Sequence, residues 1–519
     1  MFKKIIVLFV ALALLVDPLN IVASADNDFS TNITYSSDNI GCIGGTIEFN
    51  CPTVDDGSII KMMWGDSESK PLIFNSGNFN MPYSEFATAA VQNGKVSVSL
   101  NSYTAIPVGA KTILFYHSDD LIYTHPIAEN KQYNGELLYN FGALSDVHFG
   151  RYYSGKYPTK DDAETTFDNA LDLFENLDKV DVVAISGDLT VAGEELSLQK
   201  YNATISGRGF PVYSCTGNHD MSALEKGIWK QYVNNDVYRN YKDMPEILTV
   251  KGNDFVYRAP NGNDHDIFIF LSQHTGHYGS YHSELLSVEQ LEWLEKQLEK
   301  HKNETVYLFF HTFLTDIEGG NLGCGNAVSS TGVSYTLPFT YRCEDEIVFR
   351  NLLIKYKNVM FFSGHSHFEY SLQNLNVNLN VYDREGTTGP QIHLSSVTAP
   401  RNFNNDGNTI ELQGKESQGS LVSVYEDKII VYGIDFNNKT VLSYATYIFD
   451  KTIPPKNTDK PNDAVKTDSQ NTDINNAKNG NDTFMDGKIL YYIIPSVIVI
   501  VSAGVIIIIT LKRKSNKAS

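Results

Sequence analysis

The chain has 519 residues, of which 42% are hydrophobic, and this length is too great for one hydrophobic core. We therefore expect two domains with accessory segments. The net charge of −20, from 61 acidic and 41 basic residues, repels polyanions, so we expect no nucleic-acid partner.

The first 25 residues are predicted to be a signal peptide. Two lysines precede an apolar stretch from Ile5 to Val16, and Ala23-Ser24-Ala25 forms a small-x-small cleavage site. An uncleaved anchor is the alternative, but the apolar stretch is short for a membrane span. The mature chain is expected to begin near Asp26 and to lie outside the cytosol.

Residues 26–134 are predicted to form a β-sandwich of immunoglobulin or fibronectin type. Short runs such as GGTIEFNC, KVSVSLNS and KTILFYHS follow one another with turns between them, as in an all-β domain. Cys42 and Cys51 flank a Gly-Gly turn, and we expect them to form a disulfide in an oxidising compartment.

Residues 135–451 are predicted to form an α/β domain, because short buried strands alternate with helical patterns. Five of the apolar runs stop at residue types that bind metals: Asp146 and His148, Asp188, Asn218 with His219 and Asp220, His311, and His365 with His367. In α/β domains the loops beyond the carboxyl ends of the strands form the ligand crevice. These side chains should therefore converge in space.

Three helices are predicted between the strands of this domain. Residues 163–179 place Phe167, Ala170, Leu171, Phe174 and Leu177 on one face. Ser287 and Gln290 form a capping-box pattern ahead of a second helix, in which Trp293 is expected to be core, and residues 344–357 form a third. The remaining runs, including PQIHLSS, SLVSVYE, KIIVYGIDF and TVLSYATYIF, are predicted strands.

Two further cysteine predictions concern this domain. Cys324 and Cys343 flank an insertion rich in Gly, Ser and Thr, and we expect them to be bridged. Cys215 lies inside a predicted buried strand and is expected to be a free thiol.

The C-terminal part predicts a membrane anchor. Residues 452–488 are almost wholly polar and predict a disordered stalk. Residues 489–511 carry no charge and are long enough to span a bilayer, and the basic residues 512–519 predict a short cytoplasmic tail. A glycolipid-anchor signal is the alternative, but such signals usually end in the apolar run.

We therefore expect a single-pass type I membrane protein with an extracellular or lumenal ectodomain. Five glycosylation sequons lie in that ectodomain, at Asn32, Asn202, Asn303, Asn438 and Asn481.

The order D-x-H, G-D, G-N-H-D, H, G-H-x-H resembles the calcineurin-like metallophosphoesterase family, over roughly residues 137–450. The resemblance implies two mixed sheets packed face to face between helices, here preceded by the small all-β sandwich, with the late strands completing the second sheet. The G-D-x-V-D-R-G and R-G-N-H-E patterns of cytosolic Ser/Thr phosphatases are absent. Val191 stands where purple acid phosphatases have a tyrosine ligand.

The resemblance also implies a ligand set for two metal ions. The bridging carboxylate would be Asp188; the other first-metal ligands would be Asp146, His148 and His367, and the second-metal ligands Asn218, His311 and His365. The donors are oxygen and nitrogen without Cys, which suits Fe, Zn, Mn or Co. His219 would protonate the leaving oxygen, with Asp220 orienting its ring.

These features predict a phosphoesterase that uses metal-activated hydroxide on phosphate esters. Among phosphoesterases we favour a phosphomonoesterase over a phosphodiesterase acting on nucleotides or lipids. An inactive receptor or adhesion ectodomain on a stalk is the alternative from another class, but no ligand position is lost.

Overall fold

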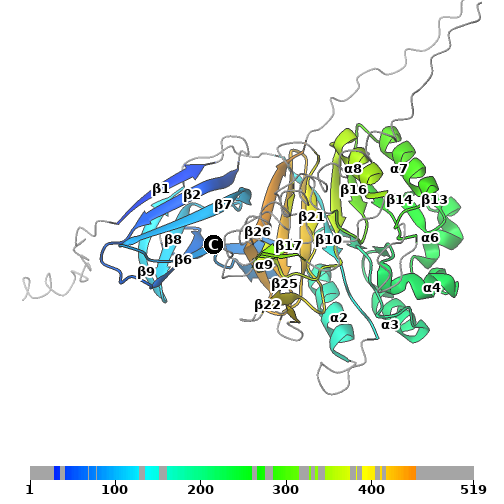
Figure 1. Ribbon diagram of the computed structural model, residues 1–519, viewed down its shortest axis with the longest axis horizontal. Helices are drawn as coiled ribbons and strands as arrows, with labels where there is room; N and C mark the ends of the chain where they lie inside the picture. Colours follow the sequence, from blue (N-terminus) through cyan, green and yellow to red (C-terminus); the bar gives the residue numbers. More distant parts are fainter. Residues whose placement is uncertain are drawn as a thin grey trace, which may run out of the picture. The chain divides into compact units, whose positions relative to one another are not determined.

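The structure is a computed structural model (Figure 1). It describes residues 29–35, 41–67, 69–76, 79–127, 135–150, 161–259, 266–274, 285–314, 326–328, 334–336, 345–373, 381–382, 388–403, 409–411 and 416–451. Among these residues, no helix combines the length and apolar character that crossing a bilayer requires. The predicted signal peptide, stalk, membrane span and tail, and the Cys324–Cys343 pair, lie outside the described residues.

A nine-stranded mixed sheet carries the first three metal-type motifs. Its order is β1 (Ser30–Tyr35), β2 (Cys42–Asn50), β7 (Lys95–Ala105), β26 (Thr440–Asp450), β25 (Lys428–Asp435), β24 (Gln418–Tyr425), β10 (Leu137–Leu144), β11 (Val180–Ile185), β12 (Val212–Ser214). The neighbours β10, β11 and β12 run parallel, so their carboxyl ends share one edge.

The late strands correct one expectation. We expected five late runs to complete the second sheet. The runs VNLNVYD and PQIHLSS do join that sheet, but β24, β25 and β26 belong to the nine-stranded sheet (Figure 1, orange). β24 pairs antiparallel with β10 over a long register, from Leu137–Tyr425 to Ala143–Ser420. Since β10 is flanked by β11 on its other side, this pairing satisfies both backbone edges of the strand that ends at the first motif.

A seven-stranded mixed sheet carries the other two motifs. Its order is β13 (Ile247–Lys251), β14 (Asp254–Arg258), β15 (Asp266–Phe270), β16 (Thr305–Phe309), β19 (Val359–Ser363), β21 (Gln391–His393), β20 (Val381–Tyr382). The four strands from β15 to β21 are parallel to their neighbours.

The two sheets pack face to face through aromatic side chains. The ring of Phe141 on β10 lies 5.0 Å from that of Phe268, 4.9 Å from that of Tyr307 and 5.9 Å from that of Phe362, which all come from the other sheet. Every one of these rings is at most 1% exposed. The fold is therefore the predicted metallophosphoesterase arrangement of two mixed sheets with helices outside.

The helices cover the outer faces as their apolar stripes predict. α2 (Asp161–Glu175) packs Phe174 against Gly142 of the nine-stranded sheet, and its predicted stripe is buried. α7 (Val288–Lys300) begins at the predicted capping box, where the Gln290 amide donates to Ser287 Oγ over 3.2 Å and the Ser287 amide donates to Gln290 Oε1 over 3.0 Å. α8 (Asp345–Lys355) packs Phe349 on Phe361, with ring centroids 5.3 Å apart.

Shorter elements connect these layers. They are α3 (Glu195–Ile205), η1 (Asn218–Asp220), α4 (Met221–Glu225), α5 (Trp229–Tyr232), α6 (Asn235–Asn240), η2 (Tyr241–Asp243), α9 (Tyr370–Gln373), and the strand pairs β17 (Asn326–Val328) with β18 (Ser334–Thr336) and β22 (Arg401–Phe403) with β23 (Thr409–Glu411).

The N-terminal part is all β, as predicted. A four-stranded sheet, β6 (Ala87–Ala90), β3 (Ile59–Gly65), β8 (Thr112–His117) and β9 (Asp120–Pro126), faces β2, since the rings of Phe49 and Phe115 lie 4.4 Å apart. A hairpin of β4 (Ile73–Ser76) and β5 (Phe79–Pro82) accompanies it. Thr104 on β7 pairs with Tyr447 on β26, so one sheet of the sandwich continues into the catalytic sheet.

The predicted Cys42–Cys51 disulfide is wrong. Both thiols are free and buried. Cys42 opens β2 and Cys51 directly follows its end, so the segment between them is an extended strand and not a turn. Nine residues of strand span about 30 Å, whereas the Cα atoms of a disulfide lie about 6 Å apart. Cys215 is a free, fully buried thiol, as predicted.

Candidate metal centre

The metal-type side chains all stand just beyond the carboxyl ends of strands. Asp146 follows β10, Asp188 follows β11, Asn218 follows β12, His311 follows β16 and His365 follows β19. The edges of the two sheets meet here, and this is why residues from five separate motifs come together. The structure brings together all seven predicted ligands, and six of them are at most 6% exposed: Asp146, His148, Asp188, Asn218, His311 and His367.

Five of the seven predicted ligands adopt left-handed backbone conformations. The φ values are 55° for Asp146, 54° for His148, 54° for Asp188, 77° for His365 and 62° for His367. Such angles are uncommon outside glycine and concentrate at functional sites, where the surrounding structure must hold them. The two sheets supply that restraint, because the His148 amide donates to the Asp188 carbonyl (3.0 Å) and the His365 amide to Asp146 Oδ2 (3.0 Å).

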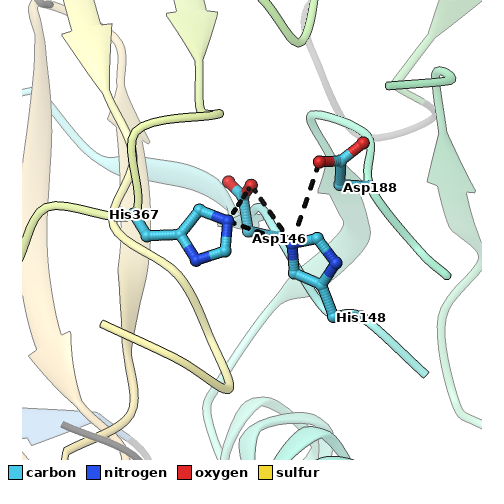
Figure 2. Close-up of side chains that lie close together, drawn as sticks. All are labelled: Asp146, His148, Asp188 and His367. Carbon is cyan, nitrogen blue, oxygen red and sulfur yellow. Dashed lines mark hydrogen bonds and ion pairs between the residues drawn. The ribbon is translucent and has the colours of Figure 1, made fainter. Parts of the chain in front are cut away.

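One group of ligand atoms comprises Asp146, His148, Asp188 and His367 (Figure 2). Nε2 of His367 lies 3.0 Å from Asp146 Oδ1 and 3.0 Å from Nε2 of His148. Nε2 of His148 lies 3.7 Å from both Asp146 Oδ1 and Asp188 Oδ2. The atoms of this group therefore converge on one small, buried volume.

A second group shares Asp188 with the first. Nε2 of His311 lies 3.1 Å from Asp188 Oδ2 and 3.2 Å from Nδ1 of His365. The Asn218 side chain joins it, with Oδ1 at 2.9 Å from Nδ1 of His365. The same carboxylate oxygen of Asp188 thus faces both groups, as a bridging ligand would.

The donor set fits metal ions. Bonds of about 2.0–2.2 Å from one ion to N and O donors separate adjacent donors by about 3.0–3.5 Å, and the measured separations lie at or near these values. Two tautomers are also fixed, because Nδ1 of His311 faces the Ser186 carbonyl (2.7 Å) and Nδ1 of His367 faces the Ala399 carbonyl (3.1 Å). A carbonyl can only accept, so each Nδ1 carries a proton, and in the neutral form of each ring Nε2 presents its lone pair to the site.

The electrostatics of the pocket agree with this arrangement for His148 and His365. Burial lowers the pKa of His148 well below its usual value and that of His365 to about 3, so both rings are neutral, as ligands must be. Burial also opposes charge on His311, but the neighbouring Asp188 carboxylate outweighs it and raises the pKa of His311 to about 9, so Nε2 of His311 must release a proton before it can bind a cation. Burial opposes ionisation of Asp146 too, yet the attraction of His367 holds its pKa well below the usual range.

His219 lies at the edge of the centre, and its ring is oriented differently from our expectation. Its backbone amide donates to Asp188 Oδ1 (2.9 Å), its ring Nδ1 donates to the Val191 carbonyl (2.5 Å), and Nε2 lies 3.9 Å from Asp188 Oδ2. We expected Asp220 to orient this ring. The orienting contact described here comes instead from the backbone of Val191.

The carboxylate of Asp220 holds two motif loops together. It accepts from the amides of Leu189 (3.2 Å), Thr190 (3.0 Å) and Gly217 (3.0 Å), and from the Thr190 hydroxyl (2.9 Å). Burial and the nearby charge of Asp188 raise its pKa to about 7, while these hydrogen bonds favour the ionised form. Asp220 therefore ties the G-N-H-D turn to the G-D loop.

The sequence did not reveal a second set of buried residues that supports the ligands. Ser396 Oγ donates to the Asp146 carbonyl (2.8 Å), and the ring of His393 contacts Ser363 Oγ (3.2 Å) and Ser366 Oγ. These residues lie in or after β21, whose sequence indicated only a strand. Side chains that contact a backbone carbonyl show no characteristic spacing in the sequence. Sequence analysis therefore cannot identify them.

The chain is similar to several known proteins. Residues 139–369 match the calcineurin-like phosphoesterase family. The chain is similar to a probable glycerophosphodiester phosphodiesterase, GpdQ, from Arcobacter nitrofigilis, with 26% identity over 172 residues. The match covers 32% of this chain and 55% of that protein, so the chain spans about half the length of this relative.

Two solved structures also align with the chain. A conserved protein from Streptococcus pneumoniae, described as a predicted phosphoesterase, has 11% identity and a TM-score of 0.25, covering 60% of this chain and 98% of its own. Vacuolar Protein Sorting 29 from Cryptosporidium parvum has 11% identity and a TM-score of 0.23, covering 60% and 96%. The match to the calcineurin-like phosphoesterase family spans residues 139–369, and this part of the chain contains all seven predicted ligands.

Proposed function

We propose that the protein is a metal-dependent phosphoesterase with a dinuclear centre. The observation that carries the proposal is Asp188, whose Oδ2 atom lies 3.1 Å from His311 Nε2 and 3.7 Å from His148 Nε2, and so faces both ligand groups. Bound as a pair, two cations lower the pKa of water and screen the charge of a phosphate ester, which otherwise repels a nucleophile.

The residues of the chain would have three roles: metal binding, proton transfer and positioning. Asp146, His148 and His367 would hold one ion, Asn218, His311 and His365 the other, and Asp188 both. His219 has its Nδ1 proton committed to the Val191 carbonyl, so Nε2 is the atom that would carry a proton to the leaving oxygen. Its side chain is 17% exposed, which gives this nitrogen access to both the centre and the solvent. Asp220 would support this residue by holding together the two loops that flank it.

Two substrate classes are candidates. We favoured a phosphomonoester from the sequence, although the motifs do not separate the two classes, because both activities share the same metal core. The relative that is named as a glycerophosphodiester phosphodiesterase favours a phosphodiester. Paired chromogenic substrates, nitrophenyl phosphate and bis-nitrophenyl phosphate, separate these candidates by their kcat/KM values on the same protein.

The experiment that tests the proposal measures metal and hydrolysis together. We expect the purified protein to contain two equivalents of Fe, Zn, Mn or Co and to lose hydrolysis when a chelator removes them. Hydrolysis that persists in fully metal-free protein would contradict the proposal, as would a protein that takes up no metal.

We also propose that the domain is carried on a type I membrane anchor. The support is the sequence: the apolar N-terminal segment with its cleavage site, the polar stalk, and the uncharged residues 489–511 with a basic flank. Three sequon residues, Asn32, Asn303 and Asn438, are exposed and thus accessible for glycosylation. Protease added to sealed cells should cleave the ectodomain and spare the tail; cleavage of the tail would overturn this topology.

A further inference from the structure

The segment of residues 394–399, which follows β21, lies between the two loops that carry the first ligand group. We call it the bridging segment. It contacts the D-x-H loop through Ser396 Oγ, which donates to the Asp146 carbonyl (2.8 Å), and Thr398 Oγ1, which donates to the Val147 carbonyl (2.9 Å). It contacts the G-H-S-H loop through the Ala399 carbonyl, which accepts from His367 Nδ1.

The hydrogen bonds of the Ser396 hydroxyl are fixed by its neighbours. It accepts from two backbone amides, those of Ala399 (2.9 Å) and Thr398 (3.3 Å), so its single proton is committed to the Asp146 carbonyl. Ser396 is fully buried and Thr398 is 7% exposed, so water does not substitute readily for either hydroxyl. The direction of these hydrogen bonds is therefore fixed by the fold.

These contacts act where the backbone is strained. Asp146 and His148 have φ values of 55° and 54°, and the carbonyls of Asp146 and Val147 lie between the two side chains that face the first metal position. A buried carbonyl without a donor is unfavourable, so the hydroxyls favour the backbone conformation that aims both side chains inward. Hydrogen bonds that orient ligands in this way commonly tune the affinity of a metal site.

We propose that Ser396 and Thr398 are positioning residues that set the metal affinity of the first position, formed by Asp146, His148 and His367 with the shared Asp188. The inference rests on the proposed function, because it presupposes that these side chains hold a metal. The described hydrogen bonds of the two hydroxyls reach the D-x-H loop and the bridging segment itself, and none reaches the second ligand group. The effect should therefore fall on one metal equivalent.

The test uses Thr398→Val, which keeps the shape of the side chain and removes the hydroxyl that donates to the Val147 carbonyl, and Ser396→Ala as a second variant. The chelator-treated full-length protein is titrated with Zn²⁺ against a chromogenic chelator. We expect two equivalents in the wild-type chain; in each variant one equivalent should bind about 10–100-fold more weakly and the other should be unchanged. Thr398→Ser, which keeps the hydroxyl, should restore the affinity.

The matched control is Ser395→Ala. Ser395 is also fully buried and directly precedes Ser396, but its Oγ makes no hydrogen bond in the described part of the chain. This variant should bind both equivalents like the wild type. Unchanged affinity in Thr398→Val and Ser396→Ala would overturn the inference, and so would an equal loss in Ser395→Ala, which would indicate packing alone. A wild-type chain that binds no Zn²⁺ would instead refute the proposed function, and the inference with it.

Discussion

Gly217 offers a direct test of how tightly the two motif loops approach each other. A Cβ atom added at Gly217 would lie 2.1 Å from Asp188 Oδ1 and 2.7 Å from the Asp188 backbone nitrogen. The φ and ψ of Gly217 are −108° and −174°, which any residue adopts, so alanine introduces no backbone strain. The whole effect of Gly217→Ala therefore comes from the collision with the shared ligand.

The size of the effect follows from these distances. A Cβ atom tolerates neighbours at no less than about 3.0 Å, so the Asp188 carboxylate must move by about 1 Å. A misplacement of that size at a reacting centre lowers the rate by about 10²-fold. Overpacking of this kind also lowers the free energy of unfolding by about 1–3 kcal/mol, which a domain of this size tolerates.

The assay compares Gly217→Ala with Gly209→Ala. An added Cβ at Gly209 meets nothing within 4 Å, so this control should keep wild-type kcat/KM and thermal stability. Gly217→Ala should keep its circular dichroism spectrum, lose about 10²-fold in kcat/KM and bind metal more weakly. Wild-type activity and metal content in Gly217→Ala would refute the view that the position of Asp188 is set by its contact with the G-N-H-D turn.

Four further predictions follow from the same structure. Asp188→Ala should lose metal and activity together, measured by elemental analysis and hydrolysis, because both ligand groups lose their shared carboxylate. His219→Ala should retain metal and lose about 10²–10⁴-fold in kcat, less for nitrophenolate than for poor leaving groups; equal losses for all leaving groups would argue against proton transfer. Burial raises the pKa of Asp254 from 3.8 to about 7, so the folded state keeps a proton that the unfolded chain releases, and stability should fall as pH rises from about 4 to 7. Asp254→Asn should remove up to about 4 kcal/mol of this pH dependence in denaturant titrations at pH 4 and pH 8, whereas an unchanged slope would mean that the carboxyl does not titrate as stated. In denaturant without reductant, Cys42 and Cys51 should both react with a thiol reagent, and mass mapping that finds them bridged would contradict the extended strand between them.

Local patterns in the sequence were sufficient for the elements and for the ligands. The capping box at Ser287 and Gln290 and the apolar stripe from Phe167 to Leu177 depend on interactions within one helix and its buried face, so they are visible in a few consecutive residues. The candidate ligands were equally visible, because metal chemistry permits few residue types and parallel strands bring their carboxyl ends to one edge.

Partners distant in sequence were decided only by the tertiary structure. Nothing local in SLVSVYE indicates that β24 pairs with β10, since any strand of suitable length and polarity could complete that edge. The Gly-Gly pair between Cys42 and Cys51 predicts a turn by propensity, but pairing of β2 with β1 and β7 keeps the segment extended. Tertiary hydrogen bonding overrode the local preference there.

The residues that hold the candidate ligands in place were likewise decided only by the tertiary structure. Asp220 was expected to contact the ring next to it in sequence, and instead it accepts four hydrogen bonds that join two loops. Ser396 lies 250 residues from the carbonyl of Asp146 that it contacts. A ligand is determined by its own chemistry and can be read in the sequence, whereas a residue that holds a ligand in place is determined by the backbone group it meets, and only the folded chain brings that group within reach.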